Sequence, residues 1–151
     1  MNIFHKILSV LAKLTANCIS ASAIKFTVDG VRYSVNDDNT TVTVAGYPSD
    51  SKPTGNLTIP KSVTFGGISY PVTSIGNYAF DGCSGLTRID AYPNPEKVST
   101  GGDAFDGVSK DGTLHVLPKY LSTYRTASQW KDFTNIKGDL TEIGASTSME
   151  R

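Results

Sequence analysis

A seven-residue motif occurs twice in this chain and constrains its fold more than any other feature. The pattern Gly-x-x-Ala-Phe-Asp-Gly spans residues 76–82 and returns at residues 101–107, so Phe80 and Phe105 are 25 residues apart. A short run with alternating apolar side chains follows each copy. One unit of this size cannot bury its apolar face alone, so successive units must stack and share a core. The repeat therefore predicts a short β-rich solenoid of about two to three units.

The sequence around the first motif resembles the BspA-type leucine-rich-repeat family of bacterial cell-surface proteins. The resemblance rests on Leu-Thr-Ile-Pro-Lys-Ser-Val at residues 57–63 and on Val-Thr-Ser-Ile-Gly-Asn-Tyr-Ala-Phe-Asp-Gly-Cys-Ser-Gly-Leu-Thr at residues 72–87. An insertion at residues 65–71 separates the two segments, and Val108 and Leu117 replace the Cys and Pro that are usual in the family. The resemblance implies a leucine-rich-repeat fold and a protein-binding or adhesion role, with partners such as host extracellular-matrix proteins or bacterial surface proteins.

Length and charge limit the classes of function that fit the chain. Its 151 residues are enough for one domain with a sizeable core, and the formal net charge is zero. Without residues 1–23 it keeps 12 basic and 14 acidic side chains, a net charge of −2. Such a balance does not indicate binding to nucleic acid or to an anionic membrane.

The first 23 residues have the pattern of a secretory signal peptide. A basic start is followed by an apolar run at residues 7–12 and by a small-x-small cleavage site at residues 21–23. The pattern predicts export, to a secreted or cell-surface location. An amphipathic helix at the N-terminus of a cytosolic protein is the alternative.

Three residues of this segment show whether it could hold the protein at a membrane, by a transmembrane span or by a lipid anchor. Lys13 and Asn17 interrupt the apolar stretch, which excludes a transmembrane span of about 20 residues. Cys18 is the one candidate for a lipid anchor, but the residues before it match a lipobox poorly. We therefore favour cleavage after residue 23.

The remainder divides into four parts. Residues 24–55 are predicted to form an N-terminal β-meander cap with a connector, and residues 56–112 the leucine-rich repeats. Residues 113–139 resemble the closing unit of such arrays and are predicted to form a C-terminal cap, with a helical pattern at residues 121–130. Residues 140–151 hold little to bury, which predicts a flexible tail.

Turn signals define two hairpins. Asp29-Gly30 lies between alternating runs and predicts a two-residue turn, and Gly66-Gly67 predicts the tip of a hairpin in the insertion. The acidic pair Asp37-Asp38 could suggest a calcium loop, but the spaced acids and the terminal Glu of such a loop are missing. Turn formation explains this pair better.

The repeat pattern also predicts which side chains form the core. The alternating runs, the motif aromatics and the last aromatic anchor supply the predicted core, which consists of Leu57, Ile59, Ile75, Phe80, Cys83, Leu86, Ile89, Phe105, Leu114, Val116 and Trp130. Cys83 could instead be a reactive thiol. Its place in the family repeat and the frequent burial of cysteine favour a packed core residue.

Aligning the three strand triplets predicts one outward face. In this alignment Thr58, Asp90 and His115 form one column of outward side chains, and Arg88, Tyr92 and Leu117 fall in the columns beside it. Stacked repeats use such faces for protein recognition, and Tyr and Arg often dominate binding energy. The alternative is a face that is only solvated.

No catalytic or cofactor-binding motif emerges from the sequence. Gly82-Cys-Ser-Gly85 is not a nucleophile elbow, and no phosphate loop, metal-ligand spacing or pair of catalytic carboxylates occurs. We therefore expect a non-catalytic binding or adhesion module without a cofactor. A structural spacer or accessory subunit of a larger surface or glycan-handling complex is the alternative. A hydrolase that uses Cys83 or His115 is a third hypothesis, to be tested.

Overall fold

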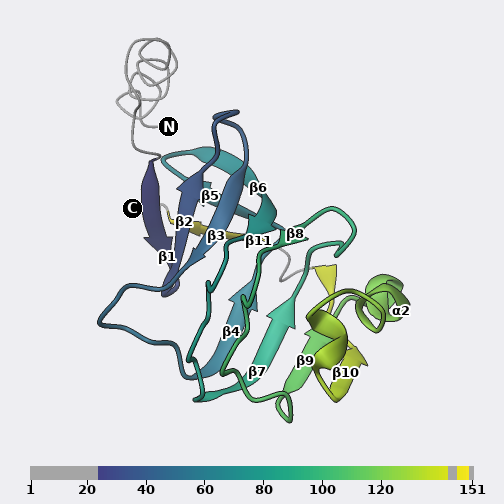
Figure 1. Cartoon of the computed structure of the whole chain (residues 1–151). Helices are drawn as coiled ribbons and strands as arrows, with labels where there is room; N and C mark the ends of the chain where they lie inside the picture. The colour runs from purple at the N-terminus through teal and green to yellow at the C-terminus, as the bar shows by residue number, and fades with distance from the viewer. Residues whose placement is uncertain (1–23, 143–145, 150–151) are drawn as a thin grey trace.

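The computed structural model describes residues 24–142 and 146–149 (Figure 1). The predicted signal peptide, including Cys18, lies outside the described residues. The described elements are β1 (Lys25–Val28), β2 (Val31–Val35), β3 (Val42–Gly46), β4 (Gly55–Ile59), β5 (Ser62–Phe65), β6 (Ile68–Ile75), β7 (Leu86–Ala91), β8 (Ser99–Thr100), β9 (Thr113–Val116), η1 (Pro118–Tyr120), α2 (Leu121–Tyr124), η2 (Trp130–Asp132), β10 (Asn135–Gly138) and β11 (Ser146–Met149).

Four strands form a parallel sheet in the order β4, β7, β9, β10, which lies at the bottom of Figure 1. Its register aligns Leu57 with Ile89, Ile89 with Leu114, and Leu114 with Ile136. The first three of these side chains are buried, whereas Ile136 is half-buried because it belongs to the last strand of the sheet. The sheet therefore presents one apolar side to the core in every repeat.

The other strands form a second sheet, in the order β1-β2-β3-β6-β5-β11 with β8 paired to β6. Strands β1, β2 and β3 are antiparallel, and the turn between the first two has positive φ at Asp29 (51°) and Gly30 (79°). The β5–β6 hairpin turns at Gly66 and Gly67, whose φ values are 61° and 79°. Positive φ at both central residues is the conformation that two-residue hairpins require, so both predicted turns are confirmed.

The second sheet also belongs to the solenoid. The end of β6 pairs in parallel with β3 on one side and with β8 on the other. A coil of the chain therefore runs from this sheet, through the motif, to the parallel sheet that contains β7. Strand β3 of the meander pairs with the edge of the first coil. The meander therefore covers the apolar end of that coil and shields it from water.

The two copies of the motif stack directly on each other. The backbone N–H groups of Tyr78, Phe80 and Gly82 donate to the carbonyl oxygens of Gly102, Ala104 and Asp106 at 2.8–3.0 Å. The rings of Phe80 and Phe105 are parallel within 12°, with their centroids 5.9 Å apart. The 25-residue spacing thus corresponds to one turn of the coil. The predicted β-rich, leucine-rich-repeat-type solenoid is confirmed.

Equivalent positions of the motif share an unusual backbone conformation. Tyr78 and Asp103 have φ of 57° and 53°, and Gly82 and Gly107 have φ of 73° and 78°. A non-glycine residue with positive φ is uncommon and costs conformational energy. Its occurrence at the same place in both copies shows that the bend belongs to the repeat and not to one loop.

The acidic pair at the β2–β3 connection forms a turn. The Asp38 carboxylate accepts hydrogen bonds from the backbone N–H groups of Thr40 and Thr41 and from the Thr41 hydroxyl, at 2.7–2.9 Å. These bonds favour the charged form and lower the pKa of Asp38 to about 2. The carboxylate thus stabilises the turn, as expected from its turn chemistry.

The C-terminal region differs from its prediction in two respects. The helix expected at residues 121–130 extends only from Leu121 to Tyr124, because the chain then turns through Gln129, whose φ of 68° cannot continue a helix. Strand β11, parallel to β5, lies in the segment expected to be a flexible tail. Before β11, the Glu142 carboxylate forms ion pairs with Lys61 and Lys119 and so links the chain end to the body.

Candidate binding face

The outward side of the parallel sheet brings together residues from every repeat. Its register places Thr58, Asp90, His115 and Lys137 in one column. The neighbouring column contains Asn56, Arg88, Thr113 and Asn135. The alignment of the three strand triplets derived from the sequence is the register of the structure, with β10 as an additional fourth strand.

Sequence reasoning did not identify the residues of β10 that belong to this face. Asn135 and Lys137 are exposed, whereas Ile136 is partly covered, which is the alternation of a strand. In the prediction from the sequence these residues belong to the C-terminal cap, residues 113–139, and no strand is predicted there. The alternation of Asn-Ile-Lys, which matches Thr-Leu-His in β9, was the signal that could have revealed the strand.

The column predicted to contain Tyr92 and Leu117 is not on the surface, and this part of the prediction is wrong. Tyr92 is 8% exposed and Leu117 is 2% exposed, and both pack with Leu140 in a small apolar cluster. The Leu140 N–H donates to the Val116 carbonyl oxygen, which draws the chain after β10 back onto the sheet. Burial beyond the strand ends therefore comes from Leu140, the first residue of the segment predicted to be a flexible tail, so that prediction is wrong at this position.

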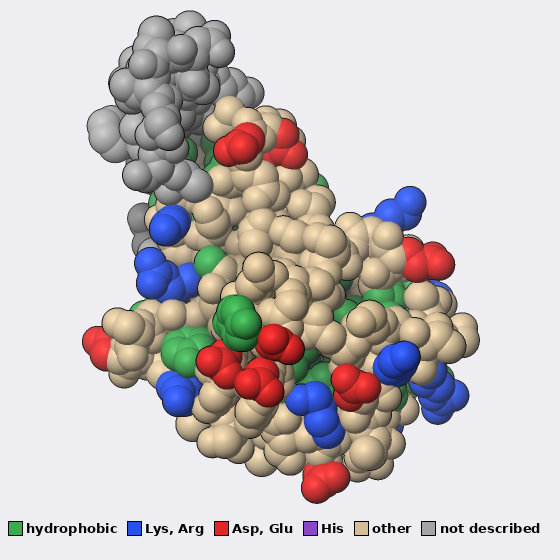
Figure 2. Space-filling view, in the orientation of Figure 1, with side chains coloured by type: hydrophobic (Ala, Val, Ile, Leu, Met, Phe, Trp, Pro, Cys, Tyr) green, Lys and Arg blue, Asp and Glu red, His purple; other side chains and the backbone are tan. Residues whose placement is uncertain are grey.

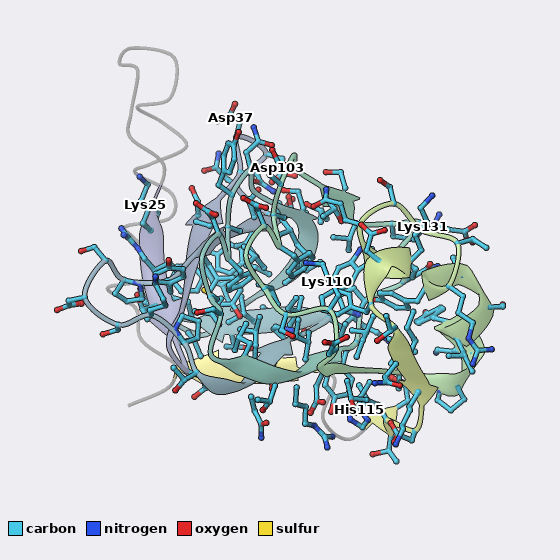
Figure 3. All side chains as sticks on the ribbon, turned by 60° about the horizontal axis from the view of Figure 1, so that its bottom comes forward. Lys25, Asp37, Asp103, Lys110, His115 and Lys131 are labelled. Atoms are coloured by element: carbon cyan, nitrogen blue, oxygen red, sulfur yellow. The ribbon has the colours of Figure 1, made fainter. Side chains whose placement is uncertain are left out.

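His115 was predicted to point outward and be exposed, but it is only 7% exposed. Its Nδ1 atom lies 2.7 Å from the Oδ1 atom of Asp139, whose side chain is itself half exposed. The imidazole thus stays on the outward side of β9, as Figure 3 shows, but the chain that follows β10 covers it. A covered ring is a poor candidate for a contact residue, and Cys83, the nucleophile it would have to serve, is itself buried in the core.

The accessible centre of the face is an ion pair. The Arg88 Nε atom lies 2.7 Å from Asp90 Oδ1, and its Nη2 atom lies 3.4 Å from Asp90 Oδ2. This carboxylate raises the pKa of the Arg88 guanidinium. The Arg88 side chain is 40% exposed and that of Asp90 is 19% exposed, with exposed Thr58 beside them. The Arg88–Asp90 ion pair thus places two oriented charged side chains at the middle of the sheet.

A hollow of about 580 Å³ lies at the open edge of this face. The β1–β2 turn and the connector before β4 form one wall, and Asn56 and Thr58 of β4 form the other. Tyr92 contributes to the lining although its ring is mostly covered. Thr58 and Tyr92, both singled out from the sequence, therefore both line this hollow.

Each predicted core side chain is at most 3% exposed. Cys83 is fully buried, and burial raises the pKa of its thiol. A thiolate is the reactive form of cysteine, so both the burial and the raised pKa oppose chemistry at this residue. Within the described part of the chain, no group of His, Cys, Asp and Glu side chains is arranged to hold a metal ion.

We expect the Cys83 thiol to react slowly with a thiol reagent in the folded protein and quickly in denaturant. Replacement by alanine should lower the free energy of unfolding by about 1 kcal/mol, and replacement by serine should lower it further because a buried hydroxyl needs a partner. A labelling time course with and without denaturant measures the first effect. Rapid labelling of the native protein would return catalysis at Cys83 to consideration.

Solved structures of bacterial leucine-rich-repeat proteins are similar to this chain. A leucine rich cell surface protein from Faecalibacterium prausnitzii A2-165 is 24% identical, with a TM-score of 0.48, over 65% of this chain and 24% of that one. A leucine-rich-repeat protein from Bacteroides capillosus ATCC 29799 is 20% identical, with a TM-score of 0.46, over 84% and 99%. The leucine-rich-repeat protein of T. pallidum is 20% identical, with a TM-score of 0.39, over 61% and 43%.

The chain spans about a quarter of the Faecalibacterium protein and nearly all of the Bacteroides capillosus protein. No family model and no curated protein matches it. Among the described residues, no helix is long and apolar enough to cross a membrane. These bacterial leucine-rich-repeat proteins, one of them a cell-surface protein, are what the chain is similar to; its solenoid fold rests on the stacked motif copies described above.

Proposed function

We propose that this chain is a BspA-type repeat protein that acts as a non-catalytic protein-binding or adhesion module at the bacterial surface. The observation that carries the proposal is the aligned outward side of the parallel sheet. We call it the sheet face and define it by its accessible side chains, Asn56, Thr58, Arg88, Asp90, Thr113, Asn135 and Lys137. Extended faces of stacked repeats are the surfaces that solenoid proteins use for recognition.

The chemistry of the sheet face favours a polar partner surface. It carries hydroxyl, amide and charged groups on rigid strands, and the one large apolar side chain exposed in the described residues, Tyr78, is not part of it. Arginine is among the residue types that most often dominate binding energy. Arg88 is already oriented by Asp90, so little side-chain entropy would be lost when a partner accepts its free N–H groups.

The proposal also includes the location of the protein and the kind of partner that it binds. The pattern of residues 1–23 and the resemblance to surface proteins support a secreted or surface-exposed location. Host extracellular-matrix proteins and neighbouring bacterial surface proteins are the partner classes that this resemblance implies. A structural spacer in a larger surface or glycan-handling complex is the alternative function, since a fold does not determine a function.

The test compares binding of the wild-type chain and of Arg88→Ala to immobilised collagen, fibronectin and laminin by surface plasmon resonance. We expect Arg88→Ala to weaken binding at least about fivefold, because a central arginine of an interface contributes more than about 1 kcal/mol. Arg32→Ala serves as the matched control, because Arg32 is half-buried on β2 of the other sheet. Binding that Arg88→Ala leaves unchanged would favour the spacer, and no binding to any of the three would reject matrix proteins as partners.

A further inference from the structure

A second, smaller hollow lies at the C-terminal end of the solenoid, away from the Arg88–Asp90 pair. Its volume is about 300 Å³, and it is lined by residues of β10, by the two residues before that strand, by Lys131 of η2 and by Arg125, which follows α2. Three of the lining side chains are cationic: Arg125, Lys131 and Lys137. Figure 2 shows Lys and Arg side chains gathered at the right margin of the molecule, over the region where Figure 1 places α2 and β10.

These three cations are not neutralised by the described part of the chain. All three are exposed, and none of them is within ion-pair distance of a described carboxylate, in contrast to Lys61, Lys119 and Arg88. No acidic side chain lines the hollow; Asp132 follows Lys131 in the sequence but is not part of the lining. Three unpaired positive charges therefore line one hollow in a chain whose formal net charge is zero.

The floor of the hollow is held in place by its own contacts. The Thr134 hydroxyl and the Asn135 side-chain amide donate to the carbonyl oxygens of Lys110 and Asp111, at 3.0 and 3.3 Å. Phe133, which also lines the hollow, packs edge-on against Phe105 with ring centroids 5.7 Å apart. The cations therefore surround a rigid surface that belongs to the core of the last repeat, so a ligand would not have to order it.

We propose that this hollow binds a tetrahedral oxyanion group, a sulfate or phosphate ester carried by a larger molecule. The guanidinium of Arg125 and the two ammonium groups offer only donors, which suit sulfate and phosphate oxygens. The three terminal oxygens of such an ester can each accept a hydrogen bond from one of the three cations, whereas a carboxylate offers only two oxygens. A volume at the small end of the range for ligand pockets fits a single charged group and not an extended ligand.

The site lies on a different element from the centre of the sheet face. Figure 3 places Lys131 beside the helical end and His115 on the parallel sheet, on opposite sides of this part of the ribbon. Asn135 and Lys137 border both surfaces, so the test leaves them in place. The inference therefore stands whether or not the sheet face binds a protein.

The test titrates the full chain with sodium sulfate, sodium phosphate and sodium acetate at constant ionic strength, with chloride as the replaced ion. Backbone amide shifts in two-dimensional NMR report the binding position, and the same spectra show that each variant is folded. We expect saturable shifts confined to residues 125–137, with sulfate and phosphate binding more tightly than acetate. A sulfated disaccharide and a phosphoserine peptide, added in separate titrations, distinguish the two sources of the oxyanion by which of them binds more tightly than the free ion.

Two double variants distinguish a specific binding site in the hollow from a general electrostatic attraction of anions to the protein. Arg125→Gln with Lys131→Gln should weaken sulfate binding at least about tenfold. Lys25→Gln with Lys97→Gln removes the same charge from exposed positions elsewhere and should change the affinity less than about twofold. Arg88→Ala should leave oxyanion binding unchanged. Equal losses in the two double variants, shifts spread over the whole surface, or equal affinity for acetate would overturn the proposal.

Discussion

Replacing Phe105 with alanine is expected to lower the free energy of unfolding by about 3–5 kcal/mol, the usual cost of removing a buried aromatic side chain. Phe105 is 2% exposed and its ring contacts those of Phe80, Trp130 and Phe133, with centroids 4.8–5.9 Å apart. It thus connects the first motif to the C-terminal cap. Truncation would leave a cavity lined by aromatic rings. The backbone hydrogen bonds between the stacked copies of the motif would keep this cavity from closing.

Urea unfolding followed by tryptophan fluorescence measures this loss, since Trp130 lies against Phe105. Phe80→Ala should have a similar cost, because Phe80 is fully buried and stacks on the same ring. Tyr78→Ala is the control: its side chain is 59% exposed, so its removal should cost less than about 0.5 kcal/mol. Unchanged stability in both Phe variants would mean that the two motifs do not stack in this register.

The second large effect is expected at Gly101, where alanine should destabilise the protein by about 2–3 kcal/mol, as overpacking of a rigid site does. A Cβ atom at this position would lie 2.5 Å from the backbone N of Asn77 and 2.7 Å from the backbone C of Gly76. These atoms belong to the first copy of the motif, and the Gly101 N–H donates to the Ile75 carbonyl oxygen at 2.7 Å. The two coils would have to separate to admit one methyl group.

Gly102 provides an adjacent control for the same substitution. A Cβ atom there would meet only the side-chain oxygen of Asn77, at 3.9 Å, and its φ is not in the left-handed region. Gly102→Ala should therefore be neutral or stabilise by up to about 1 kcal/mol, through reduced freedom of the unfolded chain. Thermal and urea unfolding of the two variants should differ clearly. Equal stabilities would show that the coils are not in the close contact described above.

Much of the solenoid could be predicted from the sequence, because its stabilising interactions are local and periodic. The motif spacing gave one turn of the coil, and the alternation around Leu57, Ile89 and Leu114 gave the register of three parallel strands. Gly66-Gly67 and Asp29-Gly30 identified their turns because few other residues adopt positive φ at both positions. The turns are encoded within a few residues, and the coil and its register are encoded by a pattern that repeats along the chain, so both can be read without the tertiary structure.

The residues that only the tertiary structure assigned lie where distant segments meet. Strand β11 pairs with β5 from more than 80 positions away in the sequence, and no local pattern encodes such a partner. Tyr92, Leu117 and His115 alternate as outward residues should, yet the chain after β10 covers them with Leu140 and Asp139. Alternation determines which side of a strand a residue occupies. Whether water reaches that side depends on what packs there, and here the tertiary structure decided it.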